Sequence, residues 1–402
     1  MSKQWEEKQV SIGGAIIAGV VTLVLGFFIG INWNNIAPSI LPYLGFRNGQ
    51  SSASYDWSSL DEVYYALKSN YDGDIDHAMI IEGAKKGMVA AVGDVYTTYM
   101  DSSEAEAYAA ELHGDVGAGI GVEIGLRENY VRVIRTLPDN PAIRAGIKAG
   151  DIIYKVNGEE VYAESTETIS SKLRGAAGTK VEVTVVRDGE EKTFTLTRET
   201  INNVSAYIEY DANTAIITIS RFDTDTGTLV KKLVDSNDFQ QRNIKKLILD
   251  LRGNGGGYVS AAKDLLSLWV DGDAILIQKS KGASDSKIYA NRSQAVLKDI
   301  PTIVLVNEST ASASEIVAGA LKDYNRATIL GKTTYGKGVV QTLLELSNDT
   351  LLKVTTARWY TPLGNSINHD GIKPDVEVDL TYDDANHNRD PQLDAAKKLE
   401  VK

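Results

Sequence analysis

The hydrophobic residues near the amino terminus form one uninterrupted run. Residues 12–31, IGGAIIAGVVTLVLGFFIGI, contain no charge over 20 positions. A helix rises about 1.5 Å per residue, so this run is long enough to cross a hydrocarbon core of about 30 Å. Lys3 and Lys8 precede the run, and the next basic residue is Arg47. The pattern predicts a single-pass anchor in the cell membrane, with residues 1–11 in the cytoplasm and the rest of the chain outside.

A cleavable signal peptide and a buried core helix are the alternatives for this run. We favour an uncleaved anchor, because the run is longer than a usual signal-peptide core and no clear A-x-A cleavage site follows it. The next residues, 32–56, contain Pro38, Pro42 and the polar string NGQSSAS. This composition predicts a linker between the membrane and the folded part of the chain.

The spacing of apolar residues changes along the folded part. Residues 57–113 have helical spacing, as in LDEVYYALKSNY and HAMIIEGAKKGMVAAV. Residues 114–200 have short strands and glycine turns instead, with a predicted hairpin around Asp188-Gly189.

From Ile201 onward, apolar strands alternate with helical stretches, which predicts an α/β domain. The strands are TAIITIS, KKLILDL and PTIVLVN, and the helical stretches are YVSAAKDLLSLWV and ASEIVAGALKDY. A short terminal helix is predicted to open at Pro391. The predicted parts are a cytoplasmic tail (residues 1–11), a membrane anchor (12–31), a linker (32–56) and a helical N-terminal segment (57–113). They are followed by a β-domain (114–200), an α/β domain (201–380) and a C-terminal helix or tail (381–402).

Composition narrows the chemistry that the chain can carry. The formal net charge is −12, which argues against nucleic-acid binding because phosphate contacts need clustered Lys and Arg. The chain has no cysteine, so disulfides, zinc–thiolate sites and a cysteine nucleophile are excluded. The acidic string DDANHN near the end suggests a metal site, but we interpret it as a solvated turn. We expect no metal and no cofactor.

The β-domain contains two strings that resemble a PDZ domain: GAGIGVEI, and NPAIRAGIKAGDIIYKVNG further on. In that family, a glycine turn binds a peptide C-terminal carboxylate with backbone N–H groups, and the peptide adds to the sheet as a strand. The resemblance implies that Gly119, Ile120, Gly121 and Val122 form this turn. It also implies that Arg174 couples peptide binding to activation. The implied partner is a protein or peptide with an exposed, apolar C-terminus.

A second glycine loop follows an apolar strand in KKLILDLRGNGGGYVSAAKDLL. Backbone N–H groups exposed at the start of a helix suit an anion, so a phosphate cradle and an oxyanion hole are both candidates. The phosphate motifs G-x-x-x-x-G-K-[ST] and G-x-G-x-x-G do not fit this string. A plain strand-to-helix turn would not need three consecutive glycines.

The segment NESTASASEIVAGALKDY places four small hydroxyl residues before a helix, at Ser309, Thr310, Ser312 and Ser314. One hydroxyl can cap the helix, which leaves others for chemistry. A hydroxyl nucleophile needs a base. The histidines are poor candidates, because His77, His113 and His387 lie in other segments and only His369, in a predicted turn, is plausible. We therefore favour a lysine over a Ser-His-Asp triad.

Lys337 lies between two glycines in YGKGVVQTLLEL, at the start of a predicted strand. A lysine acts as a base only when burial lowers its pKa from about 10.4. In an extended segment, Lys337, Val339 and Gln341 share one face, so Gln341 can orient the amine.

Together, TASASEIVAGAL, YGKGVVQ, LDLRGNGGG and the PDZ-like strings resemble the carboxyl-terminal processing peptidases, also called tail-specific proteases. The likeness extends from about residue 57 to the end and includes EGAKKGMVAAVGDVYTTYM. It implies a crotonase-like α/β domain with a Ser–Lys dyad, in which Ser312 is the nucleophile, Lys337 the general base and Gln341 the orienting residue. The N–H of Ala313 and one N–H from Gly255 or Gly256 would form the oxyanion hole.

The sequence therefore predicts a membrane-anchored serine endopeptidase that captures substrate C-termini with its PDZ domain. Two alternatives stay open: a PDZ adaptor without catalytic activity, and a crotonase-like enzyme that acts on a small thioester. The second alternative would need neither a peptide-binding domain nor a membrane anchor. Assembly into a homo-oligomer also stays open.

Overall fold

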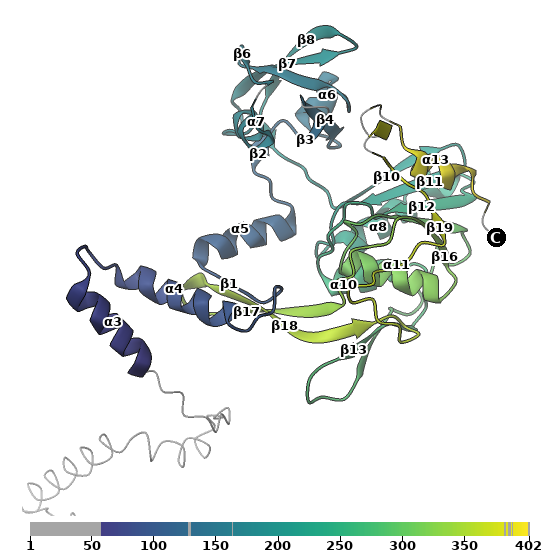
Figure 1. The fold of residues 1–402 in the computed structure, drawn as a ribbon. Coiled ribbons are helices and arrows are strands. Elements are labelled where there is room, and N and C mark those ends of the chain that lie inside the picture. Colours follow the sequence, from purple (N-terminus) through teal and green to yellow (C-terminus); the bar gives the residue numbers. More distant parts are fainter. Residues whose placement is uncertain are drawn as a thin grey trace, which may run out of the picture. The chain divides into compact units, whose positions relative to one another are not determined.

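The computed structural model describes residues 58–127, 130–162, 164–381, 383–384, 387 and 389–400 (Figure 1). The predicted cytoplasmic tail, membrane anchor and linker lie outside these residues. Among the helices that are described, none is both long and apolar enough to cross a membrane. The chain divides into two units, one ending at His77 and one beginning at Ala78.

The first unit contains helix α3 (Ser58–Asn70), and helix α4 (His77–Ala90) begins at its last residue. Strand β1 (Thr98–Met100) and helix α5 (Ser102–His113) follow in the second unit. The prediction of an all-helical segment is wrong at β1, because these three residues pair with a distant strand and this tertiary pairing overrides local propensity.

A capping box fixes the start of α5. The Asp101 carboxylate accepts a hydrogen bond from the Glu104 N–H, and the Glu104 carboxylate accepts one from the Asp101 N–H, each at 3.0 Å. The helix ends at Gly114, which has the left-handed backbone (φ 65°) that glycine tolerates best.

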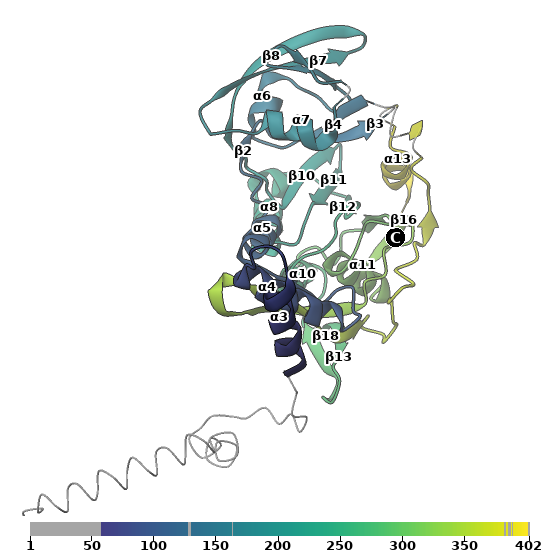
Figure 2. The same ribbon diagram turned by 60° about the vertical axis from the view of Figure 1, so that its left-hand side comes forward.

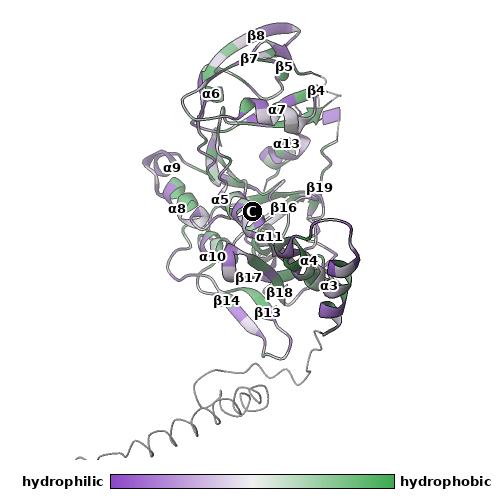
Figure 3. Cartoon of the chain, turned by 90° about the vertical axis from the view of Figure 1, so that its left-hand side faces the viewer, coloured by the Kyte–Doolittle hydropathy of each residue, from purple (hydrophilic) through white to green (hydrophobic). Residues whose placement is uncertain are grey.

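The PDZ-like domain is a sheet of order β3-β4-β5-β7-β8, with β6 on β5 and a separate pair β2-β9. The predicted hairpin is confirmed: Asp188 and Gly189 both have positive φ between β7 and β8, as a tight hairpin turn requires. Strand β8 changes between hydrophilic and hydrophobic colours along its length (Figure 3). The elements are β2 (Ala118–Gly119), β3 (Val122–Arg127), β4 (Tyr130–Thr136), α6 (Pro141–Ala145), β5 (Ile152–Val156), β6 (Glu159–Glu160), α7 (Thr166–Leu173), β7 (Lys180–Arg187), β8 (Glu190–Thr197) and β9 (Glu199–Thr200).

The α/β domain is built on a sheet of order β10-β11-β12-β15-β16-β19. All pairs in this sheet are parallel except β10-β11. The predicted alternation of strands and helices is confirmed. The elements are β10 (Ala206–Asp211), β11 (Thr214–Ile219), α8 (Thr226–Asp235), α9 (Asn237–Gln241), β12 (Lys246–Asp250), α10 (Val259–Leu266), β15 (Thr302–Val306), α11 (Ala313–Asp323), β16 (Ala327–Gly331), β19 (Val376–Glu377) and α13 (Pro391–Lys398).

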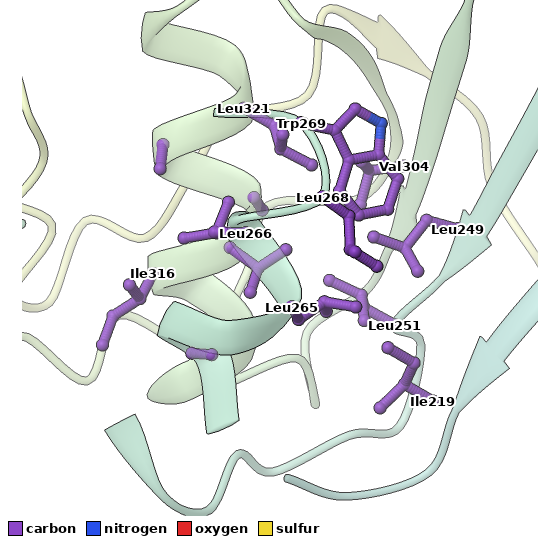
Figure 4. Packing of buried hydrophobic residues seen from close by; sticks show 14 of the residues in the cluster. Ile219, Leu249, Leu251, Leu265, Leu266, Leu268, Trp269, Val304, Ile316 and Leu321 are labelled. Carbon is purple, nitrogen blue, oxygen red and sulfur yellow. The ribbon is translucent and has the colours of Figure 1, made fainter. Parts of the chain in front are cut away.

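Alternate residues of these strands bury two faces of the sheet. Leu249 and Val304 belong to the large core shared with α8, α10 and α11, part of which Figure 4 shows. Ile248 and Ile303 belong to a smaller core that α13 covers. Helices α8, α11 and α13 are seen around the sheet in Figure 2. This two-sided burial explains why the strands are continuous apolar runs rather than alternating ones.

A second sheet has the order β1-β18-β13-β14, with β17 also paired to β18. Strand β17 begins at Val339, two residues after Lys337, and a bulge in β18 opposite Val340 and Gln341 leaves Thr356 as the extra residue. Strand β17 itself gains no residue, so the expectation that Lys337 and Gln341 share one face stays a prediction. The elements are β13 (Ala274–Lys279), β14 (Ser286–Tyr289), β17 (Val339–Glu345), the 3-10 turn η2 (Ser347–Asp349) and β18 (Leu351–Tyr360).

Candidate active site

The hydroxyl cluster before α11 divides into structural and available groups. Thr310 Oγ1 donates to the Leu251 carbonyl at 2.9 Å, and Ser314 Oγ donates to the Asn254 carbonyl at 3.0 Å. Both side chains are fully buried, so these two hydroxyls fasten the turn to the glycine loop. Ser309 is exposed. Ser312 is half-buried and lines a cavity.

The backbone of Ser312 is strained. Its φ is 55°, in the left-handed region where a residue with a side chain pays about 1 kcal/mol or more. The turn, residues 307–312, connects the end of β15 to α11, which starts at Ala313. A strained turn between a strand and a helix presents a side chain at the mouth of the sheet, which is the geometry of a nucleophile elbow.

Glu315 joins the segment of Ser312 to the segment of Lys337. One carboxylate oxygen accepts from the N–H groups of Ser312 and Lys337, both at 2.9 Å. The other oxygen accepts from Thr334 Oγ1 at 2.6 Å and the Gly336 N–H at 2.7 Å. The side chain is completely buried. A buried group that only accepts, from four donors, suits a carboxylate.

Lys337 is half-buried beside this clamp. Burial lowers the pKa of its amine, and the positive charge of Lys353 lowers that pKa further. Nζ lies 5.2 Å from the centroid of the Tyr96 ring. Within the described residues no hydrogen bond joins Nζ to Ser312 Oγ. Gln341 donates from Nε2 to the backbone carbonyl of Tyr96, so Lys337 and Gln341 both contact Tyr96 rather than each other.

The glycine loop lies against Ser312. A Cβ on Gly256 would come within 2.7 Å of the Ser312 Cβ and 3.0 Å of the Ala313 nitrogen. The Gly256 N–H donates to Asn254 Oδ1 at 2.9 Å, so the prediction that Gly256 donates to an oxyanion needs correction. In the described part of the chain, no acceptor takes the N–H of Ala313, Gly255 or Gly257.

A cavity of about 850 Å³ brings these groups together. Its lining includes Ser312, Lys337 and Gln341, and also both Gly255 and Gly256. Helix α5 and strands β17 and β18 supply other parts of the wall. A hydroxyl, an amine of lowered pKa and free backbone N–H groups therefore surround one space, which is the set of groups that acyl transfer needs.

A second cavity, of about 520 Å³, lies in the PDZ-like domain. All five residues that the sequence analysis assigns to peptide binding line it, namely Gly119, Ile120, Gly121, Val122 and Arg174. Gly121 has φ 77°, and a Cβ there would come within 2.2 Å of the Asn140 Cβ. Only glycine fits this turn.

Comparisons with known proteins agree with this organisation. The family model described as peptidase family S41 matches residues 213–378, and the PDZ domain model matches residues 118–197. The model described as the N-terminal domain of the activating protease CtpB matches residues 22–104. A probable CtpA-like serine protease of Staphylococcus aureus (strain N315) is 34% identical over 378 residues, which cover 94% of this chain and 73% of that protein. The chain belongs to peptidase family S41.

Solved structures agree with this membership. The photosystem II D1 C-terminal processing protease is 30% identical, with a TM-score of 0.51 over 81% of this chain and 87% of that one. A putative S41 protease from Bacteroides fragilis NCTC 9343 is 16% identical, with a TM-score of 0.58 over 87% of this chain and 98% of that one, which shows a shared fold. This S41 peptidase is a serine protease, and the resemblance noted in the sequence is confirmed.

The four histidines of this S41 peptidase all lie in the described part of the chain, and none of them lines the cavity that contains Ser312 and Lys337. His369 lies in a turn with φ 69°. No group of three metal-ligating side chains occurs among the described residues.

Three residues at or beside the cavity of Ser312 were not predicted from the sequence: Glu315, Tyr96 and Lys353. Glu315 could have been predicted, because Ser312-Ala-Ser-Glu315 matches the capping-box motif S-x-x-E. Tyr96 lies in the string EGAKKGMVAAVGDVYTTYM and Lys353 lies on β18, but neither position indicates a contact with Lys337. Only the pairing of β1 and β17 with β18 brings their segments to Lys337.

Proposed function

We propose that this S41 peptidase is a C-terminal processing endopeptidase in which Ser312 is the nucleophile and Lys337 the general base. The observation that supports it most strongly is the Glu315 clamp. One buried carboxylate oxygen holds the backbones of both residues at 2.9 Å. Two segments joined in this way have a fixed separation, as nucleophilic catalysis requires.

The chemical steps follow from the groups around the cavity. Neutral Lys337 takes the proton of Ser312 Oγ, and the oxygen attacks the carbonyl carbon of the scissile peptide bond. The Ala313 N–H and an N–H of Gly255 or Gly257 stabilise the oxyanion. The protonated amine gives its proton to the leaving nitrogen, and an acyl-enzyme remains. Water then attacks the ester and releases the enzyme.

This mechanism requires Lys337 to leave the ring of Tyr96 and approach Ser312. A lysine side chain has several rotatable bonds, so the movement needs no change in the clamped backbone. Gln341 would orient the amine after its amide releases the Tyr96 carbonyl.

The PDZ domain would capture the substrate. Its cavity combines the Gly119–Val122 turn, which suits a carboxylate, with the apolar residues Ile124, Leu137 and Leu173. This combination favours a protein or peptide substrate with a free, apolar C-terminus. Arg174, which also lines this cavity, would couple binding to activation.

We also propose the finer features that the sequence implies. The α/β domain would be crotonase-like, and residues 12–31 would anchor the enzyme in the cell membrane with the catalytic part outside. The domain bounds would be those given in the sequence analysis.

A peptide with an apolar C-terminus tests the proposal. The full chain in detergent should cleave it, and Ser312→Ala should reduce the rate to about one-thousandth or less, because the covalent pathway is lost. Ser309→Ala is the matched control and should keep full activity, because that hydroxyl is exposed and its side chain faces no part of the cavity. Equal cleavage by Ser312→Ala would contradict the assignment.

The second candidate function is an adaptor that binds C-termini without cleaving them. The lack of a hydrogen bond between Lys337 and Ser312 in the described structure favours it. Wild-type protein that binds the peptide and leaves it intact would support this candidate instead.

A further inference from the structure

Lys353 is a cation of the catalytic cavity that the mechanism does not use. It lies on β18, in register with Leu343 of β17 and Thr98 of β1. Its side chain is half-buried and lines the cavity that contains Ser312 and Lys337. Nζ lies 4.7 Å from the centroid of the Tyr108 ring on α5. Tyr108 lines the same cavity, so the amine and the ring lie together in its wall.

Within the described residues, no carboxylate pairs with Lys353. Another lysine of the same sheet gives a useful contrast. Lys279 on β13 also lies over a tyrosine ring, 4.8 Å from the centroid of Tyr360, but it pairs with Asp285 at 3.3 Å. Lys279 does not line the cavity. Of these two lysines, Lys353 lines the cavity and has no carboxylate partner among the described residues.

The other charges of the cavity leave Lys353 available. Arg221 is occupied by the carbonyls of His113 and Asn203 and by Asp223. Glu111 lies exposed on α5 and also lines the cavity; its negative charge raises the pKa of Lys353, against the effect of burial, but the two side chains form no ion pair. Lys337 must be neutral to act as the base. Lys353 therefore supplies the positive charge to which a bound chain is exposed.

We propose that Lys353 is a specificity-determining residue that binds a carboxylate of the substrate beside the scissile bond. This inference rests on the proposed proteolytic function. The carboxylate can come from an Asp or Glu side chain, or from the C-terminus of the substrate itself. Burial disfavours the charged form of Lys353 in the free enzyme, and a bound carboxylate would reverse that penalty. The subsite would thus be completed by the substrate.

The experiment uses the full-length enzyme in detergent and one peptide whose cleavage site is first mapped by mass spectrometry. Variants of this peptide carry Glu or Gln at each position near the cut, and each is made with a free and an amidated C-terminus. We measure kcat/KM for every peptide with wild type, Lys353→Met, Lys353→Arg and the control Lys279→Met.

We expect wild type and Lys279→Met to favour one carboxylate-bearing peptide over its neutral partner by about tenfold, which corresponds to one ordinary charge-assisted contact. Lys353→Met should reduce this ratio to about one, and Lys353→Arg should keep part of it. Loss of the Glu/Gln ratio identifies a side-chain carboxylate, and loss of the acid/amide ratio identifies the C-terminus. An acid/amide ratio that persists in Lys353→Met belongs to the PDZ domain.

The inference is wrong if wild type shows no such ratio, or if Lys353→Met leaves it unchanged. The inference is also wrong if Lys353→Met lowers kcat/KM equally for all peptides and keeps the preference for the carboxylate-bearing peptide. That result would indicate a structural or electrostatic effect on Lys337. If wild type cleaves no peptide, or Ser312→Ala cleaves as fast as wild type, the proposed function itself fails. The two failures are therefore distinguishable.

Discussion

Glu315 shows how one buried residue joins two segments of the proposed catalytic site, those of Ser312 and Lys337. Its carboxylate accepts four hydrogen bonds, from Ser312, Thr334, Gly336 and Lys337. A buried donor that loses its acceptor costs about 1–3 kcal/mol. The clamp therefore couples the stability of the fold to the geometry of the site.

Replacing Glu315 separates these two effects. Glu315→Ala should lower the free energy of unfolding by about 3 kcal/mol, because several buried donors lose their acceptor. Glu315→Gln keeps the shape but turns an NH2 group toward N–H donors, so we expect a folded protein with kcat reduced at least tenfold. Denaturant titration and peptide kinetics measure the two quantities. Full activity in Glu315→Gln would show that the carboxylate does not position the site.

Lys353 should also affect the pH dependence of the proposed base, Lys337. Its positive charge is the second cause, after burial, of the lowered pKa of Lys337. The base works when neutral, so activity rises as the pH passes upward through this pKa. Lys353→Met removes a like charge and should raise the pKa of Lys337.

The acidic limb of the kcat/KM profile should therefore move to higher pH in Lys353→Met. Lys279→Met, which removes a lysine outside the cavity, should leave the limb in place. A shift of the limb to lower pH would contradict the assignment of Lys337 as the base.

The residues most easily predicted from the sequence were those that lie in short local motifs. Ser312, Lys337 and the glycine loop lie in short sequence strings, and each string indicates its chemistry without knowledge of the tertiary structure. The hydrogen bonds and packing contacts of these residues could not be predicted from the sequence. Gln341 was expected to orient Lys337, yet its amide donates to the Tyr96 carbonyl, because the segment before β1 contacts β17. Such contacts depend on pairing between distant strands, which no local pattern encodes.

Among the elements, the glycine loop between β12 and α10 leaves no room for a side chain at Gly257. Gly257 has φ 142°, and a Cβ there would come within 2.1 Å of the Phe222 carbonyl oxygen. Phe222 is the residue that fixes the loop, since its N–H donates to Gly256 and its carbonyl accepts from Tyr258. A side chain at Gly257 would therefore move the loop away from Ser312.

Gly257→Ala should lower kcat by about a hundredfold or more, the usual effect of losing one oxyanion donor. Gly253→Ala is the matched control, because Gly253 also has positive φ but a Cβ there meets nothing within 4 Å. It should lose some stability and keep most of its activity. Similar losses of kcat in the two variants would show that the loop does not act through its position at Ser312.

Element types in the α/β domain were predictable because burial on both faces forces long apolar strands and amphipathic helices. Strand β1 was not, because the sequence around Thr98–Met100 follows two helices and continues into a third. Three residues provide too short a pattern to distinguish a strand. Pairing with β18 decides the structure of this segment.

On the scale of the whole molecule, the PDZ domain and the peptidase domain carry separate parts of the proposed function. Binding of a C-terminus can therefore be measured without cleavage. Full-length Ser312→Ala should bind a peptide with a free, apolar C-terminus at least tenfold more tightly than its amidated form, because the turn at Gly119–Val122 favours a carboxylate. Calorimetry measures both affinities.

Ile120→Asp places a negative charge in the fully buried position of that turn and should abolish the difference. Equal affinities of Ser312→Ala for the acid and the amide would place the carboxylate contact elsewhere.

The central claim is that Lys337, as a neutral amine, activates Ser312. The most direct measurement is the rate at which a fluorophosphonate labels Ser312 at a series of pH values, followed by intact mass, in wild type and Lys337→Met. We predict labelling on Ser312 whose rate rises through a midpoint below the ordinary lysine value of 10.5, and loss of labelling in Lys337→Met. Labelling that is unchanged in Lys337→Met, or that rises only above pH 10.5, would contradict the account.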